Sequence, residues 1–106
     1  MALCLIIDNP DQTAEQFEKV MEHLRAGGPV PAEGASLLIA GPADGVWRVI
    51  SVWDSPESMQ RFFAERMGPA FAAAGVSPAG STRSTFEIHT LVSTDRAALQ
   101  DSGGSR

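Results

Sequence analysis

The sequence predicts an α+β fold in which a four-stranded antiparallel sheet carries two helices on one of its faces. Three observations lead to this prediction. The chain of 106 residues, 43% hydrophobic and 20% charged, is long enough for one buried core and too short for two. Its apolar pattern gives the element order β-α-β-β-α-β. The pair Asp44-Gly45 between the second and third extended runs is a strong hairpin signal.

The first two elements are a strand and an amphipathic helix. Residues 2–8 (ALCLIID) are apolar at both alternating sets of positions, which predicts a central strand covered on both faces. Thr13 and Gln16 form a capping-box pattern, and we expect the helix that follows to end at Gly27-Gly28. The helix places apolar residues at i, i+3, i+4 and i+7. They are Phe17, Val20, Met21 and Leu24.

A hairpin and a second helix come next. Residues 35–41 and 46–53 are the two β-like runs on either side of the turn. Ser55 is a typical N-cap, and Pro56 suits the first helical position. Because Pro69 lacks an amide hydrogen, we expect it to kink or break this helix. The apolar stripe comprises Met59, Phe62, Phe63 and Met67.

The last element is a fourth strand over residues 85–92 (TFEIHTLV), which alternate in polarity. The polar residues 93–106 end in Gly and Ser, and we expect a flexible tail there. The domain therefore spans residues 1–92. The order βαββαβ is the ferredoxin-like arrangement, with both helices on one face of the sheet.

Two helices cover only one face of such a sheet, yet the third strand is apolar on both. Trp47 and Trp53 lie on one face with Val49 and Ser51, and Arg48, Ile50 and Val52 lie on the other. The economical cover for the second face is another copy of the sheet. We therefore predict a homodimer whose sheets pack face to face, with Arg48, Ile50 and Val52 at the interface. A guanidinium buried there needs a carboxylate, for which Asp8 and Glu87 are candidates.

Composition and charge exclude several classes of function. The formal net charge of −5 and a pI near 4.8 argue against nucleic-acid partners. We expect no membrane span and no signal peptide, because the first apolar run is short and lacks a basic segment before it. A single cysteine, Cys4, in an apolar strand indicates a reducing cytoplasmic setting and an inert thiol. The sequence has neither metal-ligand spacing nor a glycine-rich phosphate loop, so we expect no metal and no cofactor.

The run VWDSPESMQRFF, in which a strand-ending Trp leads directly into a capped helix, resembles the dimeric α/β-barrel superfamily. It looks most similar to the antibiotic-biosynthesis-monooxygenase (ABM) branch. The runs GVWRVISVWDS, AERMGPAFAAAG and IHTLV match the outline of small actinobacterial proteins of this kind, and the likeness covers roughly residues 2–92. The resemblance implies a ligand cavity between the sheet and the helices. It does not specify a reaction, because this scaffold hosts many chemistries.

Two departures from the family pattern limit what the resemblance implies. In haem-degrading members, the Trp at this junction works with an Asn on the first strand and a His on the second helix. Here Asn9 comes after the predicted strand, and Phe63 stands at the His position, so the resemblance does not extend to a haem oxygenase. Leu38 also occupies a place where the look-alikes often carry a His.

The Trp-bearing face allows two interpretations. In one, the indoles simply fill the core; in the other, they line an apolar pocket for a planar ligand, together with aromatic residues of the second helix. Ser51 favours a pocket slightly, because a buried hydroxyl in mid-strand needs a partner. The candidate pocket residues are Trp53, Trp47, Ser51, Met59, Phe62 and Phe63.

His89 is the candidate for acid–base chemistry. It is the only histidine on a predicted strand, and an unperturbed imidazole titrates near neutral pH. It also matches the His of the last strand in the look-alikes. The alternative is a structural, hydrogen-bonded histidine. His23 falls on the polar face of the first helix and is expected to be solvated.

These observations predict an ABM-like protein that binds a small apolar or aromatic molecule. One hypothesis is a cofactor-independent monooxygenase or cyclase acting on a planar aromatic or polyketide-like substrate held between sheet and helices. The alternative is a non-catalytic small-ligand binder or accessory protein with the same dimeric barrel. A third is a structural protein whose own side chains fill the cavity. Whether the protein is an enzyme stays open at this point.

Overall fold

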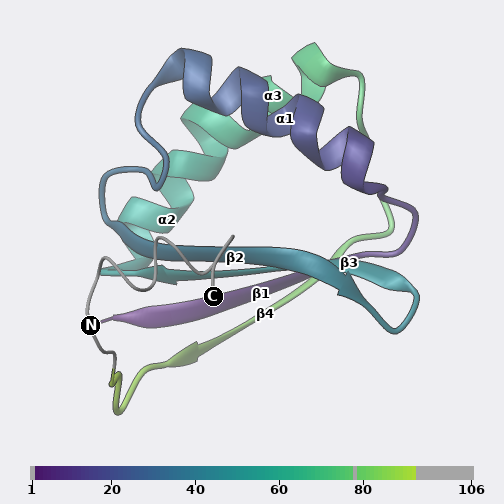
Figure 1. Cartoon of the computed structure of the whole chain (residues 1–106). Helices are drawn as coiled ribbons and strands as arrows, with labels where there is room; N and C mark the ends of the chain where they lie inside the picture. The colour runs from purple at the N-terminus through teal and green to yellow at the C-terminus, as the bar shows by residue number, and fades with distance from the viewer. Residues whose placement is uncertain (1, 78, 93–106) are drawn as a thin grey trace, which may run out of the picture.

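The computed structural model describes residues 2–77 and 79–92, and it confirms the ferredoxin-like α+β fold (Figure 1). The four strands form one antiparallel sheet in the order β2-β3-β1-β4. The predicted tail, residues 93–106, lies outside the described residues. The elements are β1 (Leu3–Asn9), α1 (Ala14–Gly27), β2 (Ala35–Ala43), β3 (Val46–Trp53), α2 (Pro56–Phe62), the π-helical turn η1 (Phe63–Met67), α3 (Gly68–Ala74) and β4 (Thr82–Glu87).

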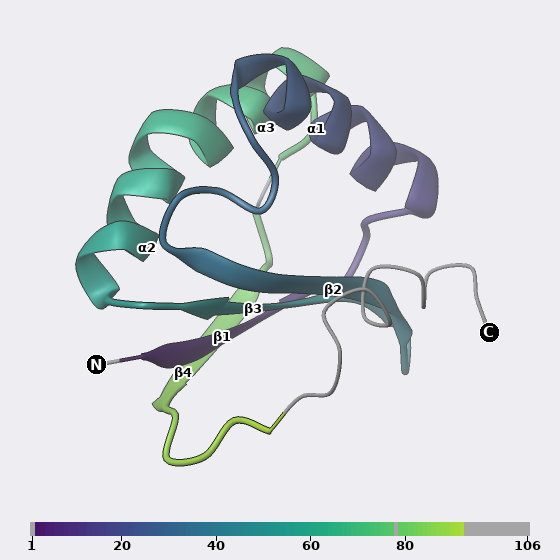
Figure 2. The same cartoon turned by 60° about the vertical axis from the view of Figure 1, so that its left-hand side comes forward.

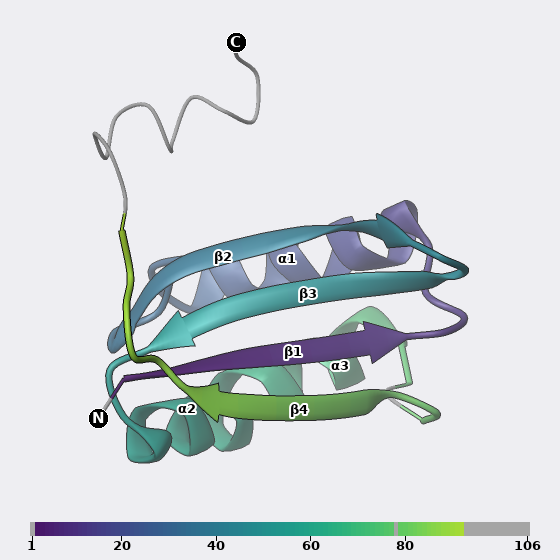
Figure 3. The same cartoon turned by 90° about the horizontal axis from the view of Figure 1, so that it is seen from below.

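All the helices lie on one side of the sheet. Figure 2 shows α1 and the run α2-η1-α3 arching above the strands, and Figure 3 shows the opposite face with no helix over it. The register pairs Leu5 with Ser51 and Ile7 with Val49, so these residues share the helix-covered face. The core lies between this face and the helices, and Leu5 and Leu24 are its most deeply buried large side chains.

Helix α1 forms as its sequence predicts. The Thr13 hydroxyl accepts the amide hydrogen of Gln16, and the Gln16 side chain accepts that of Thr13, which completes the capping box. Its apolar stripe packs Val20, Met21 and Leu24 into the core. In residues 2–77 and 79–92, no helix combines the length and the apolar character that a membrane span requires.

The second helical run is not broken at Pro69, although its helical type changes immediately before this residue. The chain stays helical from Pro56 through Ala74, with one π-helical turn immediately before the proline. In this turn the amide of Gly68 bonds to the carbonyl of Phe63. A π turn widens the helix locally, so the missing amide of Pro69 can be accommodated without a break.

The strands also differ from their predicted bounds. β2 continues to Ala43, and Asp44 and Gly45 both adopt positive φ angles of 47° and 83°, as a two-residue hairpin turn requires. The fourth strand was predicted too late in the chain. It pairs Thr82 with Asp8 and Glu87 with Leu3, and one more backbone hydrogen bond, from the amide of Ile88 to the carbonyl oxygen of Ala2, ends the ladder near the start of the chain.

The helix-free face is apolar and partly uncovered. Ile39 is 52% exposed and Phe86 56% exposed on this face. Val52 and Cys4 are buried on the same face, near the sheet end that the chain crosses after β4 (Figure 3). Burial raises the pKa of the Cys4 thiol, which fits an inert cysteine.

Candidate functional site

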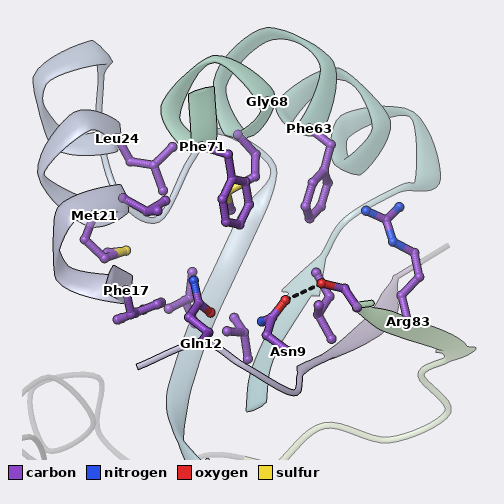
Figure 4. A pocket seen from close by; sticks show the side chains of 15 residues that line it. Asn9, Gln12, Phe17, Met21, Leu24, Phe63, Gly68, Phe71 and Arg83 are labelled. Carbon is purple, nitrogen blue, oxygen red and sulfur yellow. Dashed lines mark hydrogen bonds between the residues drawn. The ribbon is translucent and has the colours of Figure 1, made fainter. Parts of the chain in front are cut away.

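A cavity of about 270 Å³ lies between the helix-covered face of the sheet and the helices (Figure 4). Its volume is near the lower end of the ~300–1,000 Å³ typical of small-molecule sites. Ile7, Leu38 and Val49 form the floor, from three different strands. The polar residues at the cavity are Asn9, Gln12, Ser81 and Arg83.

The walls are apolar and come from two helices. Helix α1 contributes Phe17 and Met21, while the second helical run contributes Phe63, Met67 and Phe71. Phe63 and Met67 are the first and last residues of the π turn. π turns inside α-helices are frequent at functional sites because they redirect side chains. Here the turn lies beside the cavity.

Asn9 fixes one corner of the cavity. It is the last residue of β1, it shares the helix-covered face with Ile7, and it is 9% exposed. Its Nδ2 donates to the carbonyl oxygen of Trp47 at 3.3 Å, and its Oδ1 accepts from the Ser81 hydroxyl. Asn9 thus ties together β1, β3 and the loop before β4. The expectation that Asn9 follows the first strand was wrong, because β1 extends one residue further than the predicted strand, which ended at Asp8.

Gln12 provides a polar group without a protein partner. It lies in the turn between β1 and α1, and its buried Oε1 has no hydrogen-bond partner among the described residues. A buried amide oxygen without a partner is costly, unless water or a ligand satisfies it. Since the amide oxygen and nitrogen are interchangeable by rotation, Gln12 can offer a ligand either an acceptor or a donor.

Arg83 stands at another edge of the cavity, on the outer strand β4. It pairs with Ile7 across the sheet, which places it on the helix-covered face. Its guanidinium lies over the Phe63 ring, with 4.7 Å from Cζ to the ring centroid. Such stacking orients the guanidinium while its edges stay available for hydrogen bonds.

The structure separates the six predicted pocket residues, and only Phe63 lines the cavity. Trp53, Ser51, Met59 and Phe62 are buried in the core. The indole Nε1 of Trp53 donates to Ser51 Oγ at 2.8 Å, and its ring lies 5.2 Å from that of Phe62. For these four residues the core interpretation describes what the structure shows, because Trp53 finds its polar and aromatic partners inside the core.

Trp47 lies near the cavity without lining it. Its ring packs on Phe17, with centroids 5.4 Å apart, and its carbonyl holds Asn9. Its buried indole nitrogen has no partner within residues 2–77 and 79–92. Trp47 therefore supports the Phe17 wall from behind.

His89 lies away from the cavity. It follows the end of β4 in an exposed segment, and its Nδ1 is 2.8 Å from the Thr90 hydroxyl. Its predicted place on the fourth strand was wrong, because pairing with β1 stops at Glu87. The geometry gives this histidine no contact with the cavity lining.

The three residues predicted for the dimer interface lie on the helix-free face: Arg48, Ile50 and Val52. Arg48 Nε donates to Asp8 Oδ1 at 2.8 Å, and Nη2 donates to Oδ2 at 3.1 Å. This bidentate hydrogen bond lowers the pKa of Asp8 below its ordinary value. Of the two carboxylates considered from the sequence, the register selects Asp8, because it lies directly opposite Arg48.

The polar edge of the cavity was missed by the sequence reasoning. Asn9 could have been found, since it continues the alternation of Leu5 and Ile7 onto the covered face. Arg83 and Ser81 could not, because the predicted fourth strand began after them. Met67 was assigned to the apolar stripe of the second helix, but no sequence signal places it on the cavity wall.

The chain is similar to known proteins in its fold alone. No protein-family model matches the sequence, and no curated protein matches it. Among solved structures, one from Caulobacter crescentus CB15 is described as a putative antibiotic biosynthesis monooxygenase. It is 18% identical, with a TM-score of 0.63, over 84% of this chain and 91% of that one.

Two further structures are similar. SnoaB from Streptomyces nogalater, a cofactor-independent oxygenase, is 15% identical with a TM-score of 0.57, over 86% of this chain and 95% of that one. This chain shares the ferredoxin-like fold of these ABM-like proteins. A dimeric ferredoxin-like protein of unknown function from Thermobifida fusca YX is 16% identical with a TM-score of 0.58, over 83% of this chain and 92% of that one. At these identities the likeness establishes the fold and leaves the activity open.

Proposed function

We propose that this protein binds a small apolar or aromatic molecule in the cavity between its sheet and its helices. The observation that carries the proposal is the cavity of about 270 Å³ whose walls are Phe, Met and Leu side chains. Polar groups occur at only a few places on its lining. Apolar walls with a few placed polar groups are typical of sites for small organic molecules. A space of this size also argues against a cavity filled by the protein's own side chains.

The functional unit in this proposal is a homodimer formed through the helix-free faces of two sheets. Ile39 and Phe86 leave an apolar surface on that face, and such surfaces mark association sites when they are contiguous. Arg48 and Asp8 neutralise each other within one sheet. The free-energy cost of burying them against a second sheet is therefore lower than for an unpaired charge. The solved structure from Thermobifida fusca YX, which is described as dimeric, supports this assembly.

The reaction we propose for an enzyme of this type is cofactor-independent oxygenation or cyclisation of a planar aromatic, polyketide-like substrate. The fold likeness to SnoaB, a cofactor-independent oxygenase, supports it. In one such oxygenation, an anthrone methylene takes up O₂ and loses one water molecule to become a quinone carbonyl. The cavity walls would hold the ring system, and the polar edge would orient its oxygen substituents.

A specific observation favours the alternative, a non-catalytic binder. The polar residues at the cavity are Asn9, Gln12, Ser81 and Arg83, and none of them is a histidine or a carboxylic acid, the usual general bases. His89, the candidate acid–base residue, lies outside the cavity lining. A catalytic site would then have to rely on orientation and electrostatics, without a general base from the protein.

A fluorescence titration with anthrone tests binding. Phe17 lines the cavity and contacts Trp47, so a bound ring should change tryptophan emission. Val49→Phe fills the cavity floor and should weaken binding about tenfold or more. Val46→Phe is the matched control, since it adds the same volume on the same strand but on the helix-free face. Equal anthrone affinity in both variants would refute the cavity as the site.

The same samples separate the enzyme from the binder. Under air, an oxygenase converts anthrone to anthraquinone, which absorbance measures directly. Quenching of tryptophan emission without quinone formation would establish the binder. In either case His89→Ala should leave both binding and turnover unchanged, because the imidazole does not reach the cavity.

A further inference from the structure

We propose that the ligand of this cavity carries an anionic group, such as a carboxylate, and that Arg83 binds this group at the cavity edge. The inference rests on the proposed function, since it defines the chemical class of ligand for the same site. It goes beyond an apolar or aromatic ligand, because it requires a charged end on the molecule.

Arg83 is positioned to reach a ligand in the cavity. Arg83 is on the outer strand of the sheet, but its side chain turns inward over the ring of Phe63, a cavity wall residue. Figure 4 shows the guanidinium at the rim of the cavity, beside Phe63 and on the same side as Asn9. An inward-pointing charge on an edge strand also discourages pairing with another sheet, and here that charge lies against the cavity wall as well. The stack covers one face of the guanidinium, and its N–H groups remain in its plane.

The arginines of this protein differ in what their guanidinium groups contact. Arg48 is paired with Asp8, and Arg66 donates to the carbonyl oxygens of Leu24 and Pro29. Within the described residues Arg83 has neither a hydrogen bond nor a salt bridge, which is also true of the exposed Arg25 and Arg61, but of these three only Arg83 lies at the cavity. Arg83 is exposed, and a bound aromatic ring that displaces water beside its guanidinium would strengthen its interaction with an anion. In a protein of net charge −5, this local positive group selects the end of the ligand that is acidic.

The cavity wall and Gln12 indicate what the rest of the ligand is. Phe63, Met67 and Phe71 form one wall, suited to the face of an aromatic ring. The unpartnered amide of Gln12 lies at another part of the lining and calls for a hydrogen-bonding group there. Together these contacts describe a planar aromatic acid with a second polar substituent. A carboxylate suits Arg83 because a guanidinium can bind both its oxygens at once.

The test uses two probes with the same ring and different charge, 2-naphthoate and 2-naphthamide. Isothermal titration calorimetry at pH 7 and low salt measures the affinity of the whole protein for each. We expect 2-naphthoate to bind about tenfold more tightly than 2-naphthamide, and this ratio to fall as salt is added. Arg83→Gln should abolish the preference while the affinity for 2-naphthamide stays within about twofold. Arg83→Lys keeps the charge but not the planar fork, and should retain part of the preference.

Arg61→Gln is the matched control. It removes the same charge from an exposed position on α2 outside the cavity lining, and should leave the preference intact. Equal affinity of the wild-type protein for both probes would overturn the inference of an anionic ligand. It would leave the cavity as a binding site for an aromatic molecule. Loss of the preference in Arg61→Gln as well would overturn it too, because net charge alone would then be the cause. Failure of both probes to bind would refute the proposed cavity function and this inference with it.

Discussion

At the scale of single residues, the pair of Asp8 and Arg48 determines how the helix-free face can be covered. The two side chains lie opposite each other on β1 and β3 and share two hydrogen bonds of 2.8 Å and 3.1 Å. The pair is neutral as a unit, and on its face of the sheet it lies between Thr82 on β4 and the apolar pair of Ile6 and Ile50. Removing either partner leaves the other charge alone on a face that we expect to be buried, which is costly.

The same pair gives the protein a pH dependence of known sign. The hydrogen bond with Arg48 lowers the folded-state pKa of Asp8. Its contribution is therefore fully present above the unfolded pKa of about 3.9, and it is lost as pH falls through the lower folded value. We predict that Asp8→Asn is less stable than wild type at pH 7, and that this difference shrinks as pH falls below about 4.

Urea unfolding at a fixed protein concentration, repeated across pH, measures this difference. Fixed concentration is needed because dimerisation adds to apparent stability. Asp11→Asn is the control, since Asp11 is exposed and forms no salt bridge with any described residue. A difference between Asp8→Asn and wild type that grows as the solution becomes more acidic would contradict the account.

Trp53 and Ser51 illustrate how far sequence reasoning reaches for single residues. Alternation placed both on one face of β3, and the structure agrees. The alternation could not show whether Trp53 is a core residue or a pocket residue, because this depends on which helix residues cover the indole. The hydrogen bond to Ser51 joins two neighbours on one face of β3, whereas the Phe62 contact depends on how α2 packs, and no periodicity encodes it.

At the scale of elements, the π turn η1 links the cavity wall to the end of α1. Arg66, in this turn, donates to the carbonyl oxygens of Leu24 and Pro29 at 2.7 Å and 2.8 Å. Its Cζ also lies 5.5 Å from the centre of the Phe62 ring. These contacts hold together the two helical segments that form the walls on either side of the cavity.

We predict that Arg66→Met destabilises the protein by about 1–2 kcal/mol, because two charge-assisted hydrogen bonds are lost while most of the apolar stem remains. Chemical denaturation measures the change. Arg66→Lys should recover part of it, and Arg61→Met, on the exposed side of α2, should stay within ~0.5 kcal/mol of wild type. A loss of the same size in Arg61→Met would show that the contacts to α1 are not responsible.

Elements whose ends are set by residues close in sequence were predicted correctly. A strand whose bounds depend on pairing with a distant strand was not. The caps at Thr13 and Ser55 and the Asp44-Gly45 turn were predicted from short-range patterns, and the structure contains them. The fourth strand was misplaced because its alternation continues past Glu87, whereas its pairing ends within one residue of Glu87, at the hydrogen bond from Ile88 to Ala2. The π turn before Pro69 was missed, since the pattern of an α-helix does not reveal a widened turn.

At the scale of the whole molecule, the uncovered sheet face has a testable consequence. We predict that the wild-type protein is a dimer in solution and that Phe86→Glu is a monomer, because a carboxylate on this face would be buried without a partner. Thr85→Glu is the matched control, because Thr85 is also exposed but points to the other face of β4. Size-exclusion chromatography with light scattering measures the masses. A monomeric wild type at micromolar concentration would contradict the dimer.

The overall plan of the molecule was predictable, but the candidate site was predictable only in part. Element order and strand faces located a space between sheet and helices, because they follow from polarity and turn residues. Its polar edge came from places that are distant in sequence, namely Asn9 at the end of β1 and Arg83 on β4. Only the three-dimensional arrangement brings these residues to one cavity.

The most direct test of the central claim is a ¹³C methionine-methyl NMR titration with 2-naphthoate. Met21 and Met67 line the cavity, and Met59 is buried in the core outside its lining. If a ring binds where we propose, the Met21 and Met67 methyl signals should shift with a common saturation curve. The Met59 signal should stay in place. A saturating shift of Met59 alone, or no shift of Met21 and Met67 while calorimetry reports binding, would place the ligand elsewhere and contradict the account.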